Sequence, residues 1–169
     1  MRSILIFVDQ TYEDLELWYS KIRMEEAGFK TVVAGPKAKE TYLAKHGYPC
    51  IAEVSYEEVH SRDFVALLIP RGFSPDRIRR NPKALLIVEE MHEARKPIAF
   101  ICHGGWVPIS AKILRDKNVT GTLAIRDDLE NAGAKFLDQP VVVDDNLISS
   151  RTPKDLPEFT KAIIKQLGQ

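Results

Sequence analysis

The sequence has 169 residues, a length that fits one domain spanning 1–169 with its own hydrophobic core. Its 24 lysines and arginines balance its 24 aspartates and glutamates, so no net basic charge indicates binding to nucleic acid or to an anionic membrane. No apolar run is long enough for a membrane span or a signal peptide, and the two cysteines lack the spacing of a zinc site. We therefore expect a cytoplasmic protein that binds no metal and no nucleotide cofactor.

The first half of the chain alternates between apolar runs and amphipathic segments. Residues 3–8 form a continuous apolar run, which is typical of a strand buried on both faces of a parallel sheet. In the segment 13–27, Leu15, Trp18, Tyr19 and Ile22 recur at helical spacing and predict a helix with an apolar face made by these residues. The other elements predicted here are a strand at 31–34, a hairpin within 39–54 and a strand at 64–69.

The second half continues this alternation. Two helices are predicted at 75–79 and 82–94, followed by a strand at 97–101. Residues 119–144 are less regular, with a short helical piece at 127–131 and a strand at 141–143. A strand at 147–149 and an amphipathic helix at 156–167 complete the chain. Alternating strands and helices of this length predict an α/β three-layer sandwich with a mostly parallel central sheet.

The segment from Lys96 to Ile109 is the strongest functional signal in the sequence. Cys102 follows the strand predicted at 97–101 and precedes His103, two glycines and an apolar-periodic helical segment. A strand, a sharp turn and a helix can hold a side chain at the carboxyl edge of the sheet, where open α/β folds bind ligands. The helix start and the space left by Gly104 would favour a thiolate, so we expect a lowered pKa for Cys102. The alternative is that Cys102 packs as a small hydrophobic residue.

Several motifs along the chain, taken together, resemble the ThiJ/PfpI superfamily and most closely its PfpI-type intracellular protease/deglycase branch. They include Ala-Phe-Ile-Cys-His-Gly at 99–104, Glu-Asp-Leu-Glu-Leu at 13–17, Asn-Ala-Gly at 131–133 and Ser-Ser-Arg at 149–151. The resemblance implies a flavodoxin-like fold, similar also to class I glutamine amidotransferases, with a nucleophile elbow at Cys102. It also implies assembly into homodimers or larger homo-oligomers such as hexamers.

The resemblance also implies roles for individual residues. Cys102 would be the nucleophile, His103 its base, and Glu13 the acid that approaches the sulfur from the loop after the first strand. A carboxyl beside a thiol helps only when protonated, since its charge would raise the pKa of the thiol. The backbone N–H groups of Gly72 and His103 would bind the oxyanion formed on attack.

Two positions depart from the family pattern. The usual glycine pair after the third core strand is Arg71-Gly72 here, so a cation enters the expected site. Arg71 would narrow the pocket, favour substrates that carry a carboxylate, or extend into solvent. Asp76 stands where the family has an acid that reaches the histidine of a neighbouring subunit, and it is one methylene shorter than glutamate.

These residues predict a cysteine enzyme that attacks carbonyl carbon. The resemblance implies two reactions, hydrolysis of peptide or amide bonds and removal of methylglyoxal-type adducts or the dicarbonyl itself. The corresponding substrates are a peptide, a glycated protein or a small carbonyl compound. The alternative is a redox-sensing or stress-related binding protein in which Cys102 is oxidised.

Overall fold

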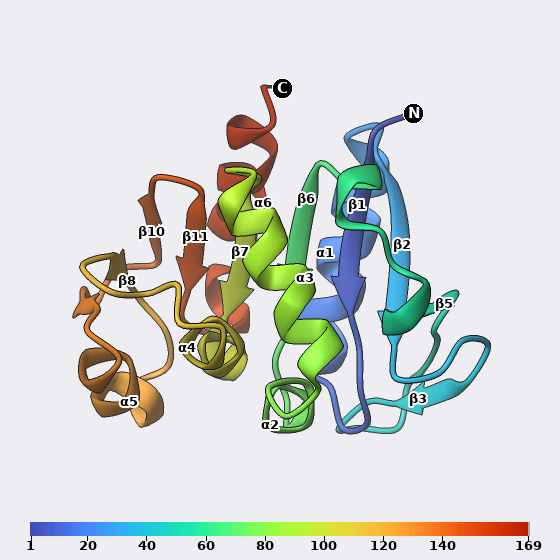
Figure 1. The fold of residues 1–169 in the computed structure, drawn as a ribbon, viewed down its shortest axis with the longest axis horizontal. Helices are drawn as coiled ribbons and strands as arrows, with labels where there is room; N and C mark the ends of the chain where they lie inside the picture. The colour runs from blue at the N-terminus through green and yellow to red at the C-terminus, as the bar shows by residue number, and fades with distance from the viewer. Residues whose placement is uncertain (169) are drawn as a thin grey trace.

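The computed structural model describes residues 1–168. In this part of the chain, the central sheet has the strand order β10-β11-β7-β6-β1-β2-β5 (Figure 1). Every neighbouring pair is parallel except β10 and β11, which run antiparallel. The strands are β1 Ser3–Phe7, β2 Lys30–Gly35, β5 Val54–Ser55, β6 Ala66–Ile69, β7 Ile98–Ile101, β10 Val141–Asp144 and β11 Leu147–Ser150.

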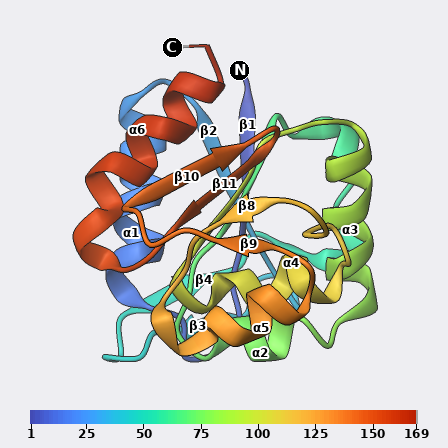
Figure 2. The ribbon, with the colours of Figure 1, turned by 90° about the vertical axis from the view of Figure 1, so that its left-hand side faces the viewer.

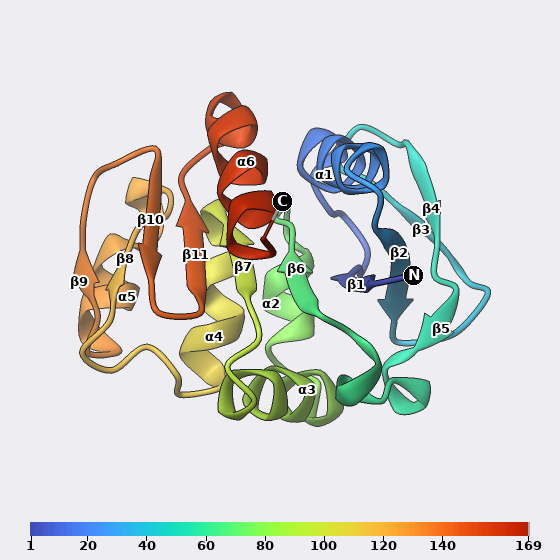
Figure 3. The same ribbon diagram turned by 90° about the horizontal axis from the view of Figure 1, so that it is seen from above.

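Helices cover both faces of this sheet and make three layers (Figure 3). Helices α1 (Asp14–Glu26) and α6 (Leu156–Gln166) pack on one face, around a core that includes Leu17, Met24 and Phe159. Helices α3 (Pro82–Glu93) and α4 (Trp106–Ser110) pack on the other face, around a second core. The short helix α2 (Ser74–Ile78) lies beyond the carboxyl ends of the strands, at the bottom of Figure 1.

Two small ribbons flank the sheet. One is the antiparallel hairpin of β3 (Thr41–Leu43) and β4 (Pro49–Ile51), within the segment where a hairpin was predicted. The other pairs β8 (Asn118–Val119) with β9 (Lys135–Phe136) and lies outside β10, together with helix α5 (Arg126–Asn131) (Figure 2). The strands β8 and β9 and the helix α5 fall largely within the segment 119–144, which had no clear periodicity.

The predicted three-layer α/β sandwich is confirmed, and most elements begin and end within two residues of their expected bounds. The face assigned to α1 was wrong. Leu15 and Ile22 are about 60% exposed, whereas Leu17, Ser20 and Met24 are buried against the sheet. Within residues 1–168, no helix is both long and apolar enough to cross a membrane.

Candidate active site

Three loops meet at the carboxyl edge of the sheet because β1, β6 and β7 are neighbours and run in the same direction. The loop after β1 leads into α1, the loop after β6 contains Arg71 and Gly72, and the turn after β7 begins with Cys102. Backbone hydrogen bonds join the first two loops, from Glu13 N to the Arg71 carbonyl at 2.7 Å and from Phe73 N to the Thr11 carbonyl at 2.8 Å. The sequence-distant residues of the site are thereby brought to one place.

Cys102 occupies the expected sharp turn between strand and helix. Its φ of +59° lies in the left-handed region that residues other than glycine rarely adopt, and the 3-10 turn Cys102–Gly105 follows. Strained backbone of this kind persists where the surrounding structure holds it, and it is concentrated at functional sites. The side chain is almost fully buried, so a reagent must enter the site to reach the sulfur.

The acid beside Cys102 is Glu16, and the prediction of Glu13 for this place was wrong. Glu13 is the N-cap of α1, where its carboxylate accepts a hydrogen bond from Glu16 N at 2.9 Å. Glu16 lies one turn further along, with no exposed surface, and its charge acts on the Cys102 thiol. An acid at the start of the helix therefore positions another acid at the nucleophile.

The environment of Glu16 favours its protonated form. Burial raises the pKa of this carboxyl to about 8, although a hydrogen bond from Arg71 N at 2.8 Å and the Arg71 charge oppose the change. Within residues 1–168, the buried Oε1 has no hydrogen-bond partner. Near neutral pH, Glu16 therefore holds a proton that it can donate to a sulfur or to a substrate oxygen.

Arg71 turns inward onto the nucleophile. Its Nη1 lies 2.8 Å from Cys102 Sγ, so the arginine does not extend into solvent, and it is half-buried at this contact. In this loop, Gly72 has the left-handed backbone conformation, with a φ of +101°, and glycine adopts it without strain. Arg71 does not have a positive φ, so its side chain causes no backbone strain here. The departure from the family pattern therefore places a cation directly on the candidate nucleophile.

The Cys102 thiol is subject to opposing effects. Burial raises its pKa and the Glu16 carboxylate adds to this, while the Arg71 guanidinium and, to a smaller extent, the Thr122 hydroxyl lower it. The net direction is upward, which contradicts the expected lowering. The contribution of Glu16 applies only when that carboxyl is ionised, so it fades near neutral pH. Within residues 1–168, the second thiol, Cys50, forms no hydrogen bond with a cation, and burial raises its pKa to about 11 although the charge of Lys21 opposes this.

His103 lies beside the sulfur, with Nδ1 3.8 Å from Cys102 Sγ. Its ring packs edge-on against Trp106, whose indole N–H donates to Asp128 Oδ2 at 2.8 Å. Burial and the Arg71 charge lower the pKa of His103, so its imidazole is neutral at physiological pH. A neutral imidazole at this distance is suited to accept the thiol proton after a small movement.

The glycines of the site have different roles. Gly72 lies opposite Tyr12 in an antiparallel β-bridge, and the two hydrogen bonds of this bridge join the residues on either side of them. Within the described residues, the Gly72 N–H donates to no backbone carbonyl. The expected role of this N–H and of the His103 N–H in binding an oxyanion remains a prediction. Gly104 packs against β6, where an added Cβ would lie 2.7 Å from the Ile69 carbonyl oxygen. Gly104 therefore allows close packing and does not widen a substrate pocket.

Asp76 is on α2, exposed, and bonded to Arg80 at 3.0 Å. In the single chain described, it has no hydrogen bond or ion pair with His103. Its predicted role across a subunit interface therefore remains a prediction.

An open pocket adjoins the site through Thr122. It has a volume of about 320 Å³ and is lined by residues 121–123 together with Asp138, Arg151 and Thr152. Elsewhere, ligand atoms of Glu13, Asp14 and His46 lie within 4.8 Å of one another, the spacing of a cation site. Asp14 already accepts a bond from His46 at 3.0 Å, and Glu13 caps α1. These contacts explain the cluster without an ion.

Sequence reasoning missed Glu16 and Thr122. Glu16 shares the buried face of α1 with Leu17, Ser20 and Met24, and the spacing of these residues could have indicated that Glu16 points inward. The prediction instead placed the more apolar opposite face of the helix against the sheet. Thr122 comes from a loop twenty residues after Cys102, and no local pattern indicated its position.

Comparisons with known proteins agree with this geometry. The family model described as DJ-1/PfpI matches residues 2–166. The chain is 42% identical to a protein of Thermococcus kodakarensis named a deglycase, and 39% identical to the deglycase PfpI of Pyrococcus furiosus, with 98% of this chain and 99% of each relative covered. A solved two-domain protein from Anabaena variabilis, with DJ-1/ThiJ/PfpI-like and ferritin-like domains, is 41% identical with a TM-score of 0.97. The match covers 99% of this chain and 48% of that protein.

Proposed function

Because this chain belongs to the DJ-1/PfpI family, we propose that it is a cofactor-independent enzyme in which Cys102 attacks the carbonyl carbon of its substrate. Its relatives named deglycases favour the removal of dicarbonyl adducts from proteins, or conversion of the dicarbonyl itself, over peptide hydrolysis. The observation that carries the proposal is the position of Cys102, which is strained at a strand–helix turn with Arg71 Nη1 at 2.8 Å and buried Glu16 beside it.

The first step would proceed through groups that the structure places together. As the thiol loses its proton to His103, Arg71 balances the thiolate charge. The thiolate forms a bond to the carbonyl carbon, and the carbonyl electron pair moves onto oxygen. The N–H groups of Gly72 and His103 would stabilise this oxyanion, which then takes the proton of Glu16.

Completion of deglycation needs water and no external oxidant. In a methylglyoxal adduct, breaking the carbon–nitrogen bond releases the amine with a proton and leaves the aldehyde carbon that the thiolate attacks. The hydrogen on that carbon then moves as a proton to the neighbouring ketone carbon through an enediol, which oxidises the first carbon to a thioester and reduces its neighbour to an alcohol. Water hydrolyses the thioester to lactate and the free thiol. The adduct and water therefore balance the amine and lactate.

The proposal is tested with Cys102→Ser, using Cys50→Ser as the matched control because both are buried thiols. The substrates are methylglyoxal-modified N-acetylarginine, free methylglyoxal and a fluorogenic peptide, and the products are lactate and cleaved peptide. We expect lactate formation by the wild type and by Cys50→Ser, and none by Cys102→Ser. Lactate formation by Cys102→Ser at the wild-type rate would refute the proposal, and cleavage of the peptide alone would assign the site to hydrolysis.

A redox-sensing role is a second candidate because the Arg71 cation contacts the sulfur and would pair with an oxidised, anionic product. Two equivalents of peroxide would convert the Cys102 thiolate to a sulfinate, with reduction of each peroxide to water. Intact mass after mild peroxide would show two added oxygen atoms in the wild type and none in Cys102→Ser. Resistance of Cys102 to oxidation would exclude this role.

We also propose that the chain assembles into homodimers or larger rings and that Asp76 of one subunit orients His103 of another. The exposed position of Asp76 and the apolar surface of α1, with Leu15 and Ile22 exposed, support association. Light scattering across a dilution series, together with activity per chain, tests this idea. Full activity in a demonstrated monomer would refute the shared site.

A further inference from the structure

The backbone of Arg71 is held so that its side chain meets the nucleophile. Arg71 N donates to Glu16 Oε2 at 2.8 Å, and its carbonyl accepts from Glu13 N at 2.7 Å. Both contacts come from the start of α1, a long element that packs on the sheet. The position of the guanidinium at Cys102 Sγ is therefore built into the fold and does not depend on a mobile surface side chain.

The guanidinium has more donors than its contacts use. It carries five N–H groups, and the bond from Nη1 to Cys102 Sγ uses one of them. Nε is buried and has no hydrogen-bond partner in residues 1–168. Several arginines elsewhere pair with acids, as Arg151 does with Asp138 and Asp155. In the described residues, no carboxylate forms an ion pair with the Arg71 guanidinium, so its direct anionic partner is Cys102 once the thiol has lost its proton.

Nucleophilic attack removes that partner. When sulfur bonds to carbon, it becomes an uncharged thioether sulfur, and the negative charge moves to the former carbonyl oxygen. A half-buried guanidinium would then lack a counter-charge next to it. A carboxylate attached to the attacked carbon would lie two bonds from the sulfur, and Arg71 Nη1 is 2.8 Å from that sulfur. Arginine binds carboxylates through paired hydrogen bonds, and such a substrate would use the idle donors.

We infer that Arg71 is a specificity-determining residue that makes Cys102 prefer electrophiles with a carboxylate on the attacked carbon, the class represented by 2-oxo acids. This inference rests on the proposed thiolate chemistry and names its substrate class. In the step concerned, the sulfur–carbon bond forms, the carbonyl electron pair moves to oxygen, and Glu16 supplies the proton. Neutral dicarbonyls undergo the same attack without the ion pair to Arg71.

The inference is tested with two alkylating agents, iodoacetate and iodoacetamide. Iodoacetate transfers a carboxymethyl group to the sulfur and iodoacetamide a carbamoylmethyl group, each with loss of iodide, so they differ in whether the attacked carbon bears a carboxylate or a neutral amide. Rate constants for Cys102 in the full chain are measured by peptide mass spectrometry at one pH, and each is divided by the rate constant of N-acetylcysteine. The normalised ratio of iodoacetate to iodoacetamide then reports the charge preference of the site alone.

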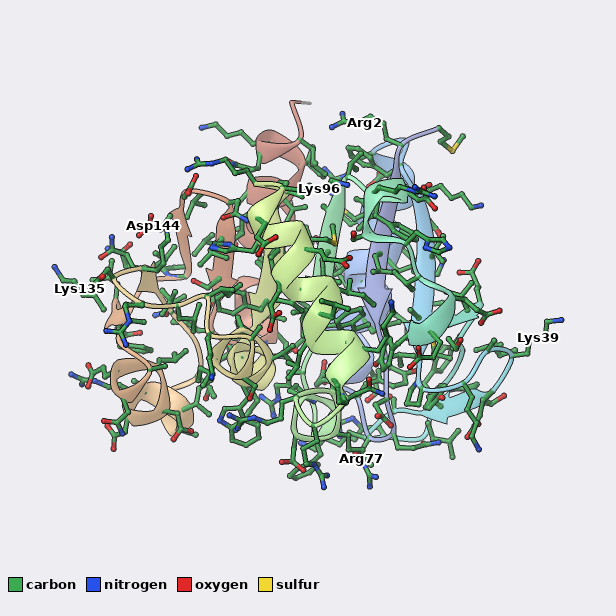
Figure 4. The ribbon with its side chains drawn as sticks, viewed as in Figure 1. Arg2, Lys39, Arg77, Lys96, Lys135 and Asp144 are labelled. Carbon is green, nitrogen blue, oxygen red and sulfur yellow. The ribbon has the colours of Figure 1, made fainter. Side chains whose placement is uncertain are left out.

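We expect this ratio to exceed unity by about tenfold or more in the wild type and to fall to about one in Arg71→Met. Arg71→Lys, which keeps the charge without the planar fork, should be intermediate. The matched control is Arg77→Gln, which removes an exposed arginine at the same end of the molecule (Figure 4) and should retain the wild-type ratio. Slow labelling of buried Cys50 in the same digest reports that each variant is folded.

A ratio near one in the wild type, or a ratio unchanged in Arg71→Met, would overturn the inference. An equal loss in Arg77→Gln would also do so, because it would assign the preference to the general surface charge. Alkylation requires no turnover, so its result is separate from the proposed function. Deglycase activity without a charge preference would refute only the inference, and a charge preference without activity would refute only the proposed function.

Discussion

Replacing Glu16 with glutamine tests the buried, protonated carboxyl at the site. Burial raises the pKa of Glu16 from 4.5 to about 8, so the folded state binds this proton more tightly than the unfolded chain does. The stabilisation from this proton is complete below about pH 4.5 and is lost as the pH rises through 8. At about 1.4 kcal/mol per pKa unit, the loss is on the order of 5 kcal/mol in the free energy of unfolding.

Glutamine keeps the shape and the acceptor oxygen but cannot ionise. The free energy of unfolding of Glu16→Gln should therefore rise relative to that of the wild type by several kcal/mol between pH 5 and pH 9. Urea denaturation at intervals of about one pH unit measures this difference. Glu130→Gln, which removes a surface carboxyl paired with Arg126, is the control and should show no such trend. Parallel pH profiles for Glu16→Gln and the wild type would show that Glu16 ionises in the folded protein as it does in the unfolded chain.

Four further predictions concern other residues of the site. Glu13→Ala should lower the free energy of unfolding by about 1 kcal/mol through loss of the helix cap, while the alkylation rate of Cys102 stays within about twofold; a large loss of reactivity would return Glu13 to the site. Gly72→Ala should cost about 2 kcal/mol or more, measured by urea denaturation, because its φ is +101° and an added Cβ would meet the facing loop. Arg71→Met should move the pH dependence of Cys102 alkylation by iodoacetamide to higher pH, and an unchanged profile would contradict the thiolate pairing. Asp76→Ala should reduce activity per chain if the acid acts between subunits, whereas full activity would confine the site to one chain.

Local patterns were sufficient for the architecture because each core strand here is a short, purely apolar run. Residues 3–8 and 97–101 could only be buried on both faces, and strands of this kind imply a parallel sheet with helices on each side. Runs of this kind do not fix the order of the strands, so the adjacency of β1, β6 and β7, and with it the meeting of their loops at Cys102, was decided by the tertiary structure. In the less regular segment 119–144, the predicted helical piece and the predicted strand at 141–143 correspond to α5 and β10. The two-residue strands β8 and β9, which pair with each other, are too short to show a periodicity and were not predicted.

The sequence by itself determined the α/β class, the turn at Cys102 and the presence of acids and Arg71 near the sheet edge. Only the tertiary structure decided which acid meets the sulfur and where the arginine points. The reason is that α1 has apolar residues on both sides, and packing chose the side with Leu17 and Met24, which carries Glu16 inward. Likewise, a guanidinium after a strand can enter solvent or the site, and contacts from the start of α1 to the Arg71 backbone hold it in the site.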